Sequence, residues 1–229
     1  MTTDSLLLQG ARSRLADISD RIGSAARVAG RPADAVTLIA ISKTQDAAAI
    51  TPLIAAGQTV FGENRVQEAE GKWPALRDAH PGLTLHMVGQ LQSNKAEDAV
   101  RLFDAIHGLD RLSLVGALAR AMDKADRRPD CFVQVNIGDE AQKGGCPVAD
   151  LPALLAGARG ADLPVAGLMC VPPADVEAAP YFALLAKLAR DNGVAGLSMG
   201  MSGDFETAVM LGATHVRVGT ALFGTRDRP

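Results

Sequence analysis

Two kinds of hydrophobic pattern alternate along the chain. Between residues 5 and 29, apolar residues recur every three or four positions, through Leu8, Leu15 and Ile22. This spacing predicts an amphipathic helix that packs on the body of the protein. A short coiled coil has a similar spacing, but several positions of this stripe are alanine, which favours the packed helix.

From residue 35 onward, short apolar runs of strand length alternate with segments of helical period. The predicted strands cover residues 36–42, 59–61, 83–89, 103–107, 131–137, 165–170, 195–199 and 215–219. The predicted helices cover residues 47–56, 66–80, 95–102, 111–127, 148–159, 178–191 and 205–211, with Pro74 as a break in the second. Strands that alternate with helices form parallel βαβ units.

Eight such strands predict the fold class. They favour an α/β protein with a single (β/α)8 TIM-type barrel over residues 35–226 and an extra N-terminal helix over residues 5–29. An open doubly wound sheet is the alternative. No linker or low-complexity segment interrupts the pattern, so we expect one domain over residues 1–229.

Composition narrows the classes of partner. The 229 residues are 48% hydrophobic and 21% charged, which is ordinary globular usage. The net charge is −3 and only 3% of residues are aromatic, so neither charge attraction nor base stacking favours nucleic acid. The apolar runs are too short to cross a membrane. We therefore expect no nucleic-acid or membrane partner, and a monomer or weak dimer.

The cysteines, histidines and N-terminus add three expectations. The three cysteines, Cys131, Cys146 and Cys170, are odd in number and form no CxxC motif, so neither a disulfide framework nor a zinc site is expected. The four histidines lack metal-ligand spacing as well. Asp4 stands early and no basic patch precedes an apolar run, so we expect no signal peptide and a cytoplasmic location.

The loops after the last two predicted strands carry the clearest candidate chemistry. In a (β/α)8 barrel the active site lies at the C-terminal ends of the strands, and phosphate often binds after strands 7 and 8. Here these loops contain Ser202, and then Gly219 and Thr220. Glycine lets the backbone approach an anion, and hydroxyl and N–H groups donate to it. The alternative is a pair of tight turns in which Ser202 caps the following helix.

Lys43 follows the first predicted strand at the mouth of the barrel. A sheltered lysine amine forms an imine with an aldehyde. Opposite a phosphate site, its natural ligand would be a phosphorylated aldehyde, and pyridoxal 5'-phosphate fits that description. A solvated surface charge is the alternative.

Arg217 stands between Val216 and Val218, so it points to the opposite face of its strand. A guanidinium only donates hydrogen bonds, so a pyridine nitrogen facing it must be unprotonated. An ion pair with Asp204 or Glu206 is an equally good interpretation at this point.

Six runs in order along the chain resemble one known family, the pyridoxal phosphate homeostasis proteins. The runs are AISKT at 40–44, FGENRVQE at 61–68, LQSNK at 91–95, GLM at 167–169, LSMGMS at 197–202 and VRVGTALFG at 216–224. The resemblance covers residues from about 35 to 226. It implies an alanine-racemase-like barrel that holds pyridoxal 5'-phosphate as a lysine aldimine.

By matched position, the resemblance also implies the cofactor-binding residues. They are Lys43 for the aldimine, Asn64 beside the cofactor, Arg217 facing the pyridine, and Ser202, Gly219 and Thr220 around the phosphate. Lys143 matches a further lysine of the family. Three residues depart from the usual pattern: Gln45, where many members have lysine, Gln90 for proline, and Cys170 for alanine.

The function implied is vitamin B6 homeostasis: a carrier that holds pyridoxal phosphate without catalytic turnover, with apoenzymes that use this cofactor as recipients. The alternative is an amino-acid racemase on the same barrel, which needs a base on each face of the substrate Cα. The single tyrosine, Tyr181, lies in a predicted outer helix, so a second base is missing and we expect no catalytic residues. A third candidate is a barrel aldolase that forms an imine on Lys43 directly.

Overall fold

The structure is a computed structural model that describes residues 3–224 of the chain. Its eight strands form a closed barrel in which each strand pairs in parallel with the next along the chain, and the last pairs with the first. The strands are β1 (Thr37–Ile41), β2 (Val60–Glu63), β3 (Thr84–Met87), β4 (Ala105–Leu109), β5 (Asp130–Gln134), β6 (Val165–Met169), β7 (Gly196–Ser198) and β8 (His215–Val218). The predicted (β/α)8 barrel is confirmed, and the open doubly wound sheet is wrong.

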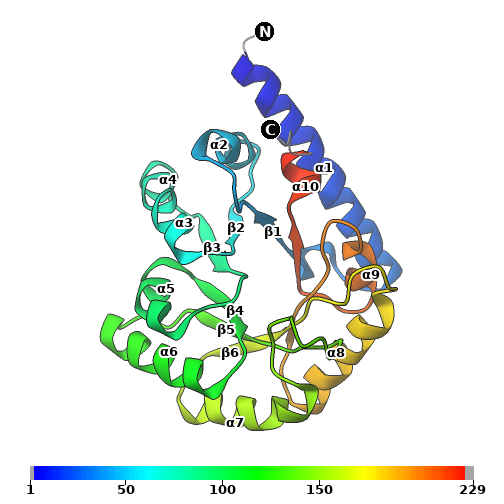
Figure 1. Ribbon diagram of the computed structural model, residues 1–229. Helices are drawn as coiled ribbons and strands as arrows, with labels where there is room; N and C mark the ends of the chain where they lie inside the picture. The colour runs from blue at the N-terminus through cyan, green and yellow to red at the C-terminus, as the bar shows by residue number, and fades with distance from the viewer. Residues whose placement is uncertain (1–2, 225–229) are drawn as a thin grey trace.

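Helices surround the barrel as a ring (Figure 1). They are α1 (Thr3–Val28), α2 (Ala47–Ala55), α3 (Val66–Glu70), α4 (Trp73–Ala79), α5 (Ala96–Leu102), α6 (Leu112–Ala125), α7 (Leu151–Gly160), α8 (Ala179–Asp191), α9 (Phe205–Met210) and α10 (Thr220–Phe223). None of the helices described within residues 3–224 is long and apolar enough to cross a membrane. The final residues of the predicted barrel, 225–226, lie outside the described residues.

Two helices differ from the prediction. The helix expected over residues 66–80 is two helices, and the break lies at Gly71 and Lys72 rather than at Pro74. Pro74 instead sits in the first turn of α4, where the missing N–H of proline costs nothing. The short helix α10 was not predicted, because four residues are too few to show a helical period.

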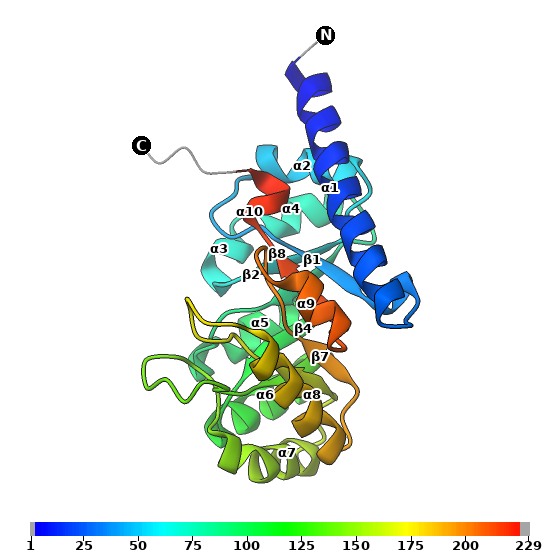
Figure 2. The same cartoon turned by 90° about the vertical axis from the view of Figure 1, so that its right-hand side faces the viewer.

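The N-terminal helix packs on the barrel as predicted. It runs along the flank of the molecule against α2, α9 and α10 (Figure 2). Its stripe of Ala11, Ile18 and Ile22 is buried. Arg21 adds a two-pronged ion pair to Glu206 of α9, with nitrogen–oxygen distances of 2.9 and 3.0 Å. The stripe is therefore covered by the chain's own barrel and is not a coiled-coil surface.

The barrel encloses an unusually polar interior. Side chains alternate along each strand, so one set faces the helices and the other faces the barrel axis. On β8, Val216 and Val218 join the apolar core under the helices, while His215 contacts the rings of His86 and His107. A buried arginine, Arg217, belongs to the same inner set as His215 and extends toward the mouth.

Candidate functional site

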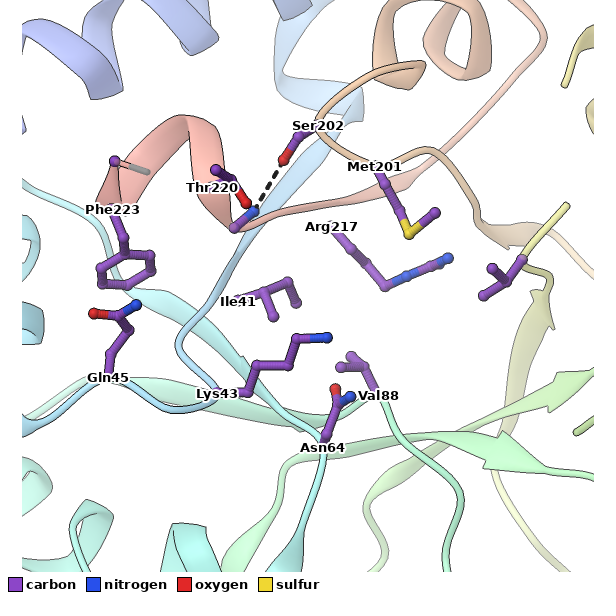
Figure 3. Close-up of a pocket in the computed structure, with 13 residues that line it drawn as sticks. Ile41, Lys43, Gln45, Asn64, Val88, Met201, Ser202, Arg217, Thr220 and Phe223 are labelled. Atoms are coloured by element: carbon purple, nitrogen blue, oxygen red, sulfur yellow. Dashed lines mark hydrogen bonds between the residues drawn. The ribbon is translucent and has the colours of Figure 1, made fainter. Parts of the chain in front are cut away.

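A cavity of about 340 Å³ opens at the C-terminal ends of the strands (Figure 3). Part of its wall is apolar, from Ile41, Val88, Met201 and Phe223 among others. All six residues predicted to bind a cofactor line this one cavity: Lys43, Asn64, Ser202, Arg217, Gly219 and Thr220. The structure thus brings together residues from the ends of β1, β2 and β8 and from the loop after β7.

Lys43 stands two residues beyond β1 and is half-buried. In Figure 3 its side chain extends into the cavity, with Asn64 beside it and Arg217 on the far side. The next residue, Thr44, has a φ of 62°, which is a strained conformation for a branched side chain. Surrounding contacts must therefore hold this turn in place.

Lys72 supplies those contacts from behind the turn. Its Nζ donates to the backbone carbonyls of Ser42 and Gln45, both at 2.9 Å. The same Nζ lies 2.8 Å from Oε1 of Glu63 and 3.0 Å from Oε1 of Glu68. One ammonium group therefore clamps both sides of the turn that carries Lys43.

Two glutamates complete the clamp. Glu63 is fully buried and accepts hydrogen bonds from Ser42 Oγ at 2.6 Å and from Trp73 Nε1 at 3.0 Å. Glu68 accepts from the strained Thr44 N–H. Burial opposes ionisation of Glu68, but the hydrogen bonds from Lys72 and from Thr44 outweigh it and lower its pKa.

The sequence analysis missed this clamp. A signal for it exists, because Lys72 follows Glu68 by four residues, which is the spacing of an ion pair along the helix predicted over residues 66–80.

The far end of the cavity is formed by hydrogen-bond donors. The Gly219 N–H donates to Ser202 Oγ at 3.3 Å, which ties the loop after β7 to the loop after β8. Thr220 begins α10, and the first N–H groups of a helix have no acceptor within it. This end of the cavity therefore combines two hydroxyls with helix N-terminal N–H groups.

Ser202 does not cap the following helix. Helix α9 begins at Phe205, and its N-cap residue is Asp204, whose carboxylate accepts from the Met201 N–H at 2.6 Å. Gly200, with a φ of 93°, lets the loop approach α9, since a Cβ there would lie 2.6 Å from that of Ala208. The tight-turn interpretation of Ser202 as a helix cap is wrong.

Arg217 is fixed by acceptors at the C-terminal ends of β6 and β7. Its Nη1 donates to Ser198 Oγ at 2.7 Å, and its Nη2 donates to the Cys170 carbonyl at 2.8 Å. Burial lowers the pKa of the Arg217 guanidinium, although arginine remains protonated in proteins. Within residues 3–224 neither Asp204 nor Glu206 pairs with it, so the ion-pair interpretation is wrong.

The three cysteines are buried free thiols. Burial raises the pKa of each thiol to about 12, so none is a nucleophile at neutral pH. Cys170 contributes its backbone carbonyl to Arg217 and not its sulfur.

Other lysines of interest lie outside the cavity. Lys143 donates to the Pro172 carbonyl at 2.9 Å and pairs with Glu140 at 2.6 Å, so it links two loops to each other. Lys95 pairs with Asp98 at 3.1 Å and lines a neighbouring cavity. Among residues 3–224, no group of three or more His, Cys, Asp or Glu side chains is arranged to hold a metal ion.

Comparisons with known proteins point to one family. The family model described as alanine racemase, N-terminal domain, matches residues 14–227. The pyridoxal phosphate homeostasis protein of Pseudomonas aeruginosa is 41% identical, over 93% of this chain and 94% of that protein. The protein of the same name in Escherichia coli K12 is 38% identical, over 93% and 95%.

A solved structure agrees with this relation. PipY of Synechococcus elongatus, with PLP bound, superposes with a TM-score of 0.77 at 40% identity. The match covers 90% of this chain and 100% of that one.

Proposed function

This chain belongs to the pyridoxal phosphate homeostasis protein family, and from that premise we propose that it binds pyridoxal 5'-phosphate and contributes to vitamin B6 homeostasis. The observation that carries the proposal is the cavity itself. It sets the amine of Lys43 opposite the donors of Ser202 and Thr220, with Arg217 on a third side. PipY, which is 40% identical, holds PLP.

The donor set fits this cofactor. Hydroxyl and N–H donors at Ser202, Gly219 and Thr220 suit the phosphate dianion, and among the residues that the structure describes no carboxylate lines the cavity to repel it. The apolar walls of Ile41 and Val88 suit the faces of a pyridine ring. A volume of about 340 Å³ is within the ordinary range for small-ligand sites.

Each residue then has a separate task. Bound pyridoxal phosphate supplies an aldehyde that condenses with a primary amine and releases water. In this proposal Lys43 provides that amine, and the Lys72 clamp holds its backbone in place. Arg217 donates to the ring nitrogen, and Asn64 contacts the cofactor beside Lys43. Ser202, Gly219 and Thr220 bind the phosphate.

We propose a carrier rather than an enzyme, formed by one barrel domain over residues 1–229. A racemase needs a second base across from Lys43, and Tyr181 lies on the outer helix α8 rather than in the cavity. The recipients in this proposal are apoenzymes that require the cofactor. The proposed location is the cytoplasm, in keeping with three free thiols, and the proposed assembly is a monomer or weak dimer.

A transfer experiment tests the function. The protein is loaded with pyridoxal phosphate, freed of excess cofactor by gel filtration, and mixed with an apoenzyme that needs it. We expect a visible absorbance band on the loaded protein and recovery of the recipient's activity. Lys43→Ala is the matched variant and should carry no cofactor through the column. A wild-type protein that gains no visible band would contradict the proposal and leave the direct aldolase as the better interpretation.

A further inference from the structure

Arg217 is the first member of a chain of hydrogen bonds that crosses the interior of the barrel. Its Nη1 lies 2.7 Å from Ser198 Oγ, which lies 2.8 Å from Nδ1 of His107. Nε2 of His107 lies 3.0 Å from Nδ1 of His86. These four residues come from β8, β7, β4 and β3, and all are buried.

The hydrogen bonds of this chain can run from donor to acceptor in only one direction. Arg217 can only donate, so Ser198 Oγ is its acceptor. Within residues 3–224 the other partner of the Ser198 side chain is His107. If His107 also donated to Ser198, the buried hydroxyl hydrogen would have no acceptor, which costs free energy. Ser198 therefore donates to Nδ1 of His107.

The direction fixes the tautomers of both histidines. With Nδ1 of His107 an acceptor, the ring hydrogen of neutral His107 is on Nε2 and is donated to Nδ1 of His86. Neutral His86 then also carries its hydrogen on Nε2. Every bond in the chain runs away from the cofactor cavity, beginning at Arg217.

The surroundings keep the histidines of this hydrogen-bond chain uncharged. His107 stacks on Phe132 with ring centroids 4.2 Å apart. The ring of His215 lies edge-on to that of His107, with centroids 5.9 Å apart. Burial lowers the pKa of His107 well below its usual range, and charge repulsion from Arg217, and from His86 or His215 whenever either is protonated, adds to the effect. Arg217 is thus the cation of this cluster.

We propose that Ser198, His107 and His86 are positioning residues, which form a one-way hydrogen-bond relay that holds Arg217 as the donor to the ring nitrogen of the bound cofactor. The inference rests on the proposed function. Ser198 accepts a hydrogen bond from Nη1 of Arg217, and the Cys170 carbonyl accepts one from Nη2. The remaining N–H groups of the guanidinium are left to donate into the cavity. Because a guanidinium has no acceptor of its own, the anchored Arg217 stays a fixed donor.

Two measurements test the relay. The first is ¹⁵N NMR of the histidine rings in the ligand-free protein. We expect the Nε2–H tautomer for both His107 and His86 at neutral pH. A doubly protonated His107, or its Nδ1–H tautomer, would overturn the proposed direction.

The second measurement compares two ligands: pyridoxal phosphate and its analogue with C–H in place of the ring nitrogen. Ser198→Ala should weaken pyridoxal phosphate about tenfold, a loss of ~1.4 kcal/mol, and weaken the analogue much less. Ser198→Thr, which keeps the hydroxyl, should restore the preference. Equal losses for the two ligands would mean that Ser198 has only a structural role.

A matched pair of variants separates loss of the relay from general disturbance of the fold. His107→Phe and His215→Phe change the same cluster in the same way, but only His107 belongs to the relay. We expect the ligand preference to fall in the first and to persist in the second, and equal losses would overturn the relay. If the wild-type chain binds neither ligand, the proposed function fails and this inference fails with it. If only the relay is wrong, the wild-type chain still binds pyridoxal phosphate.

Discussion

At the scale of single residues, the two ends of the cavity use donors of different kinds. Arg217 is buried and held by two strands, while Ser202 is half-buried and Thr220 is exposed. A buried cation discriminates strongly between ligands. A ligand that accepts its hydrogen bond gains much free energy, and one that does not leaves a buried charged donor unpaired, which costs much free energy. In the proposed site, the hydroxyls near solvent would bind and release an anion with less reorganisation.

This difference predicts a selective loss of affinity in hydroxyl variants. Ser202→Ala and Thr220→Val should each weaken pyridoxal phosphate by about 1.5–3 kcal/mol, the range for a hydrogen bond to a charged group. Unphosphorylated pyridoxal should bind nearly as before, and calorimetric titration of both ligands measures this. Ser113→Ala, on an exposed face of α6, is the control. Equal losses for both ligands would remove the phosphate role.

The sequence predicted the direction of Arg217 but not its anchors. Strand alternation around Val216 and Val218 was enough to place Arg217 inside the barrel. Its acceptors, the Cys170 carbonyl just after β6 and Ser198 Oγ on β7, lie 47 and 19 residues away in the chain. No local pattern carries such a contact, because the closure of the barrel creates it.

At the scale of elements, the turn that presents Lys43 depends on the break between α3 and α4. At this interruption the backbone of Lys72 leaves helical geometry, with a φ of −131°, and its side chain reaches the turn after β1. Pro74 marked a break in the sequence prediction, and the structure places that break two or three residues earlier. Hydrophobic period locates helices well, but their ends depend on such polar contacts.

Removal of Lys72 should therefore disturb both stability and binding. Lys72→Met leaves Glu63 as a buried charge without its partner, which costs about 3–5 kcal/mol of unfolding free energy. Urea denaturation should show this loss, and the double variant Lys72→Met/Glu63→Gln should recover part of it. Covalent capture of pyridoxal phosphate should slow in both variants, since both lack the clamp on Ser42 and Gln45. Unchanged capture would mean that the turn holds its shape without Lys72.

At the scale of the whole molecule, the polar interior of the barrel makes the fold sensitive to acid. Burial, with charge repulsion from neighbouring cations, lowers the pKa of His86 and of His215 from 6.5 to about 4. In the unfolded chain both groups regain ordinary values. Between pH 6.5 and about 4 the unfolded state therefore binds more protons than the folded state.

The free energy of unfolding should accordingly fall on acidification through this window. The expected slope is about 1.4 kcal/mol per pH unit for each such histidine. Urea titrations across the window measure it, and His215→Gln should show a shallower slope than the wild-type protein. A free energy that stays flat, or rises as pH falls, would be incompatible with neutral interior histidines.

The position of Tyr181 in the fold predicts that the protein does not racemise amino acids. With Tyr181 on α8, the described part of the chain offers Lys43 no partner base across the cavity. Incubation of the loaded protein with L- or D-alanine in deuterated water should give slow exchange at Cα at most, without inversion. Inversion of either enantiomer at roughly 1 s⁻¹ or faster would identify a racemase.

Much of this architecture follows from the sequence because it repeats. Eight alternations of strand and helix predicted the barrel, and the rule that strand ends carry the chemistry led to Lys43 and Gly219. The interior histidines escaped notice, because a search for metal spacing along the chain does not detect residues that meet only across the barrel. His86 and His107 are 21 residues apart and lie within hydrogen-bond distance.

Borohydride trapping shows directly whether Lys43 is the amine that holds pyridoxal phosphate. Reduction of the loaded protein fixes the cofactor on whichever amine holds it, and mass mapping of the digested peptides identifies that amine. We expect one modified peptide, containing Lys43, and none in Lys43→Ala. A cofactor fixed instead on Lys95 or Lys143, with Lys43 unmodified, would contradict it.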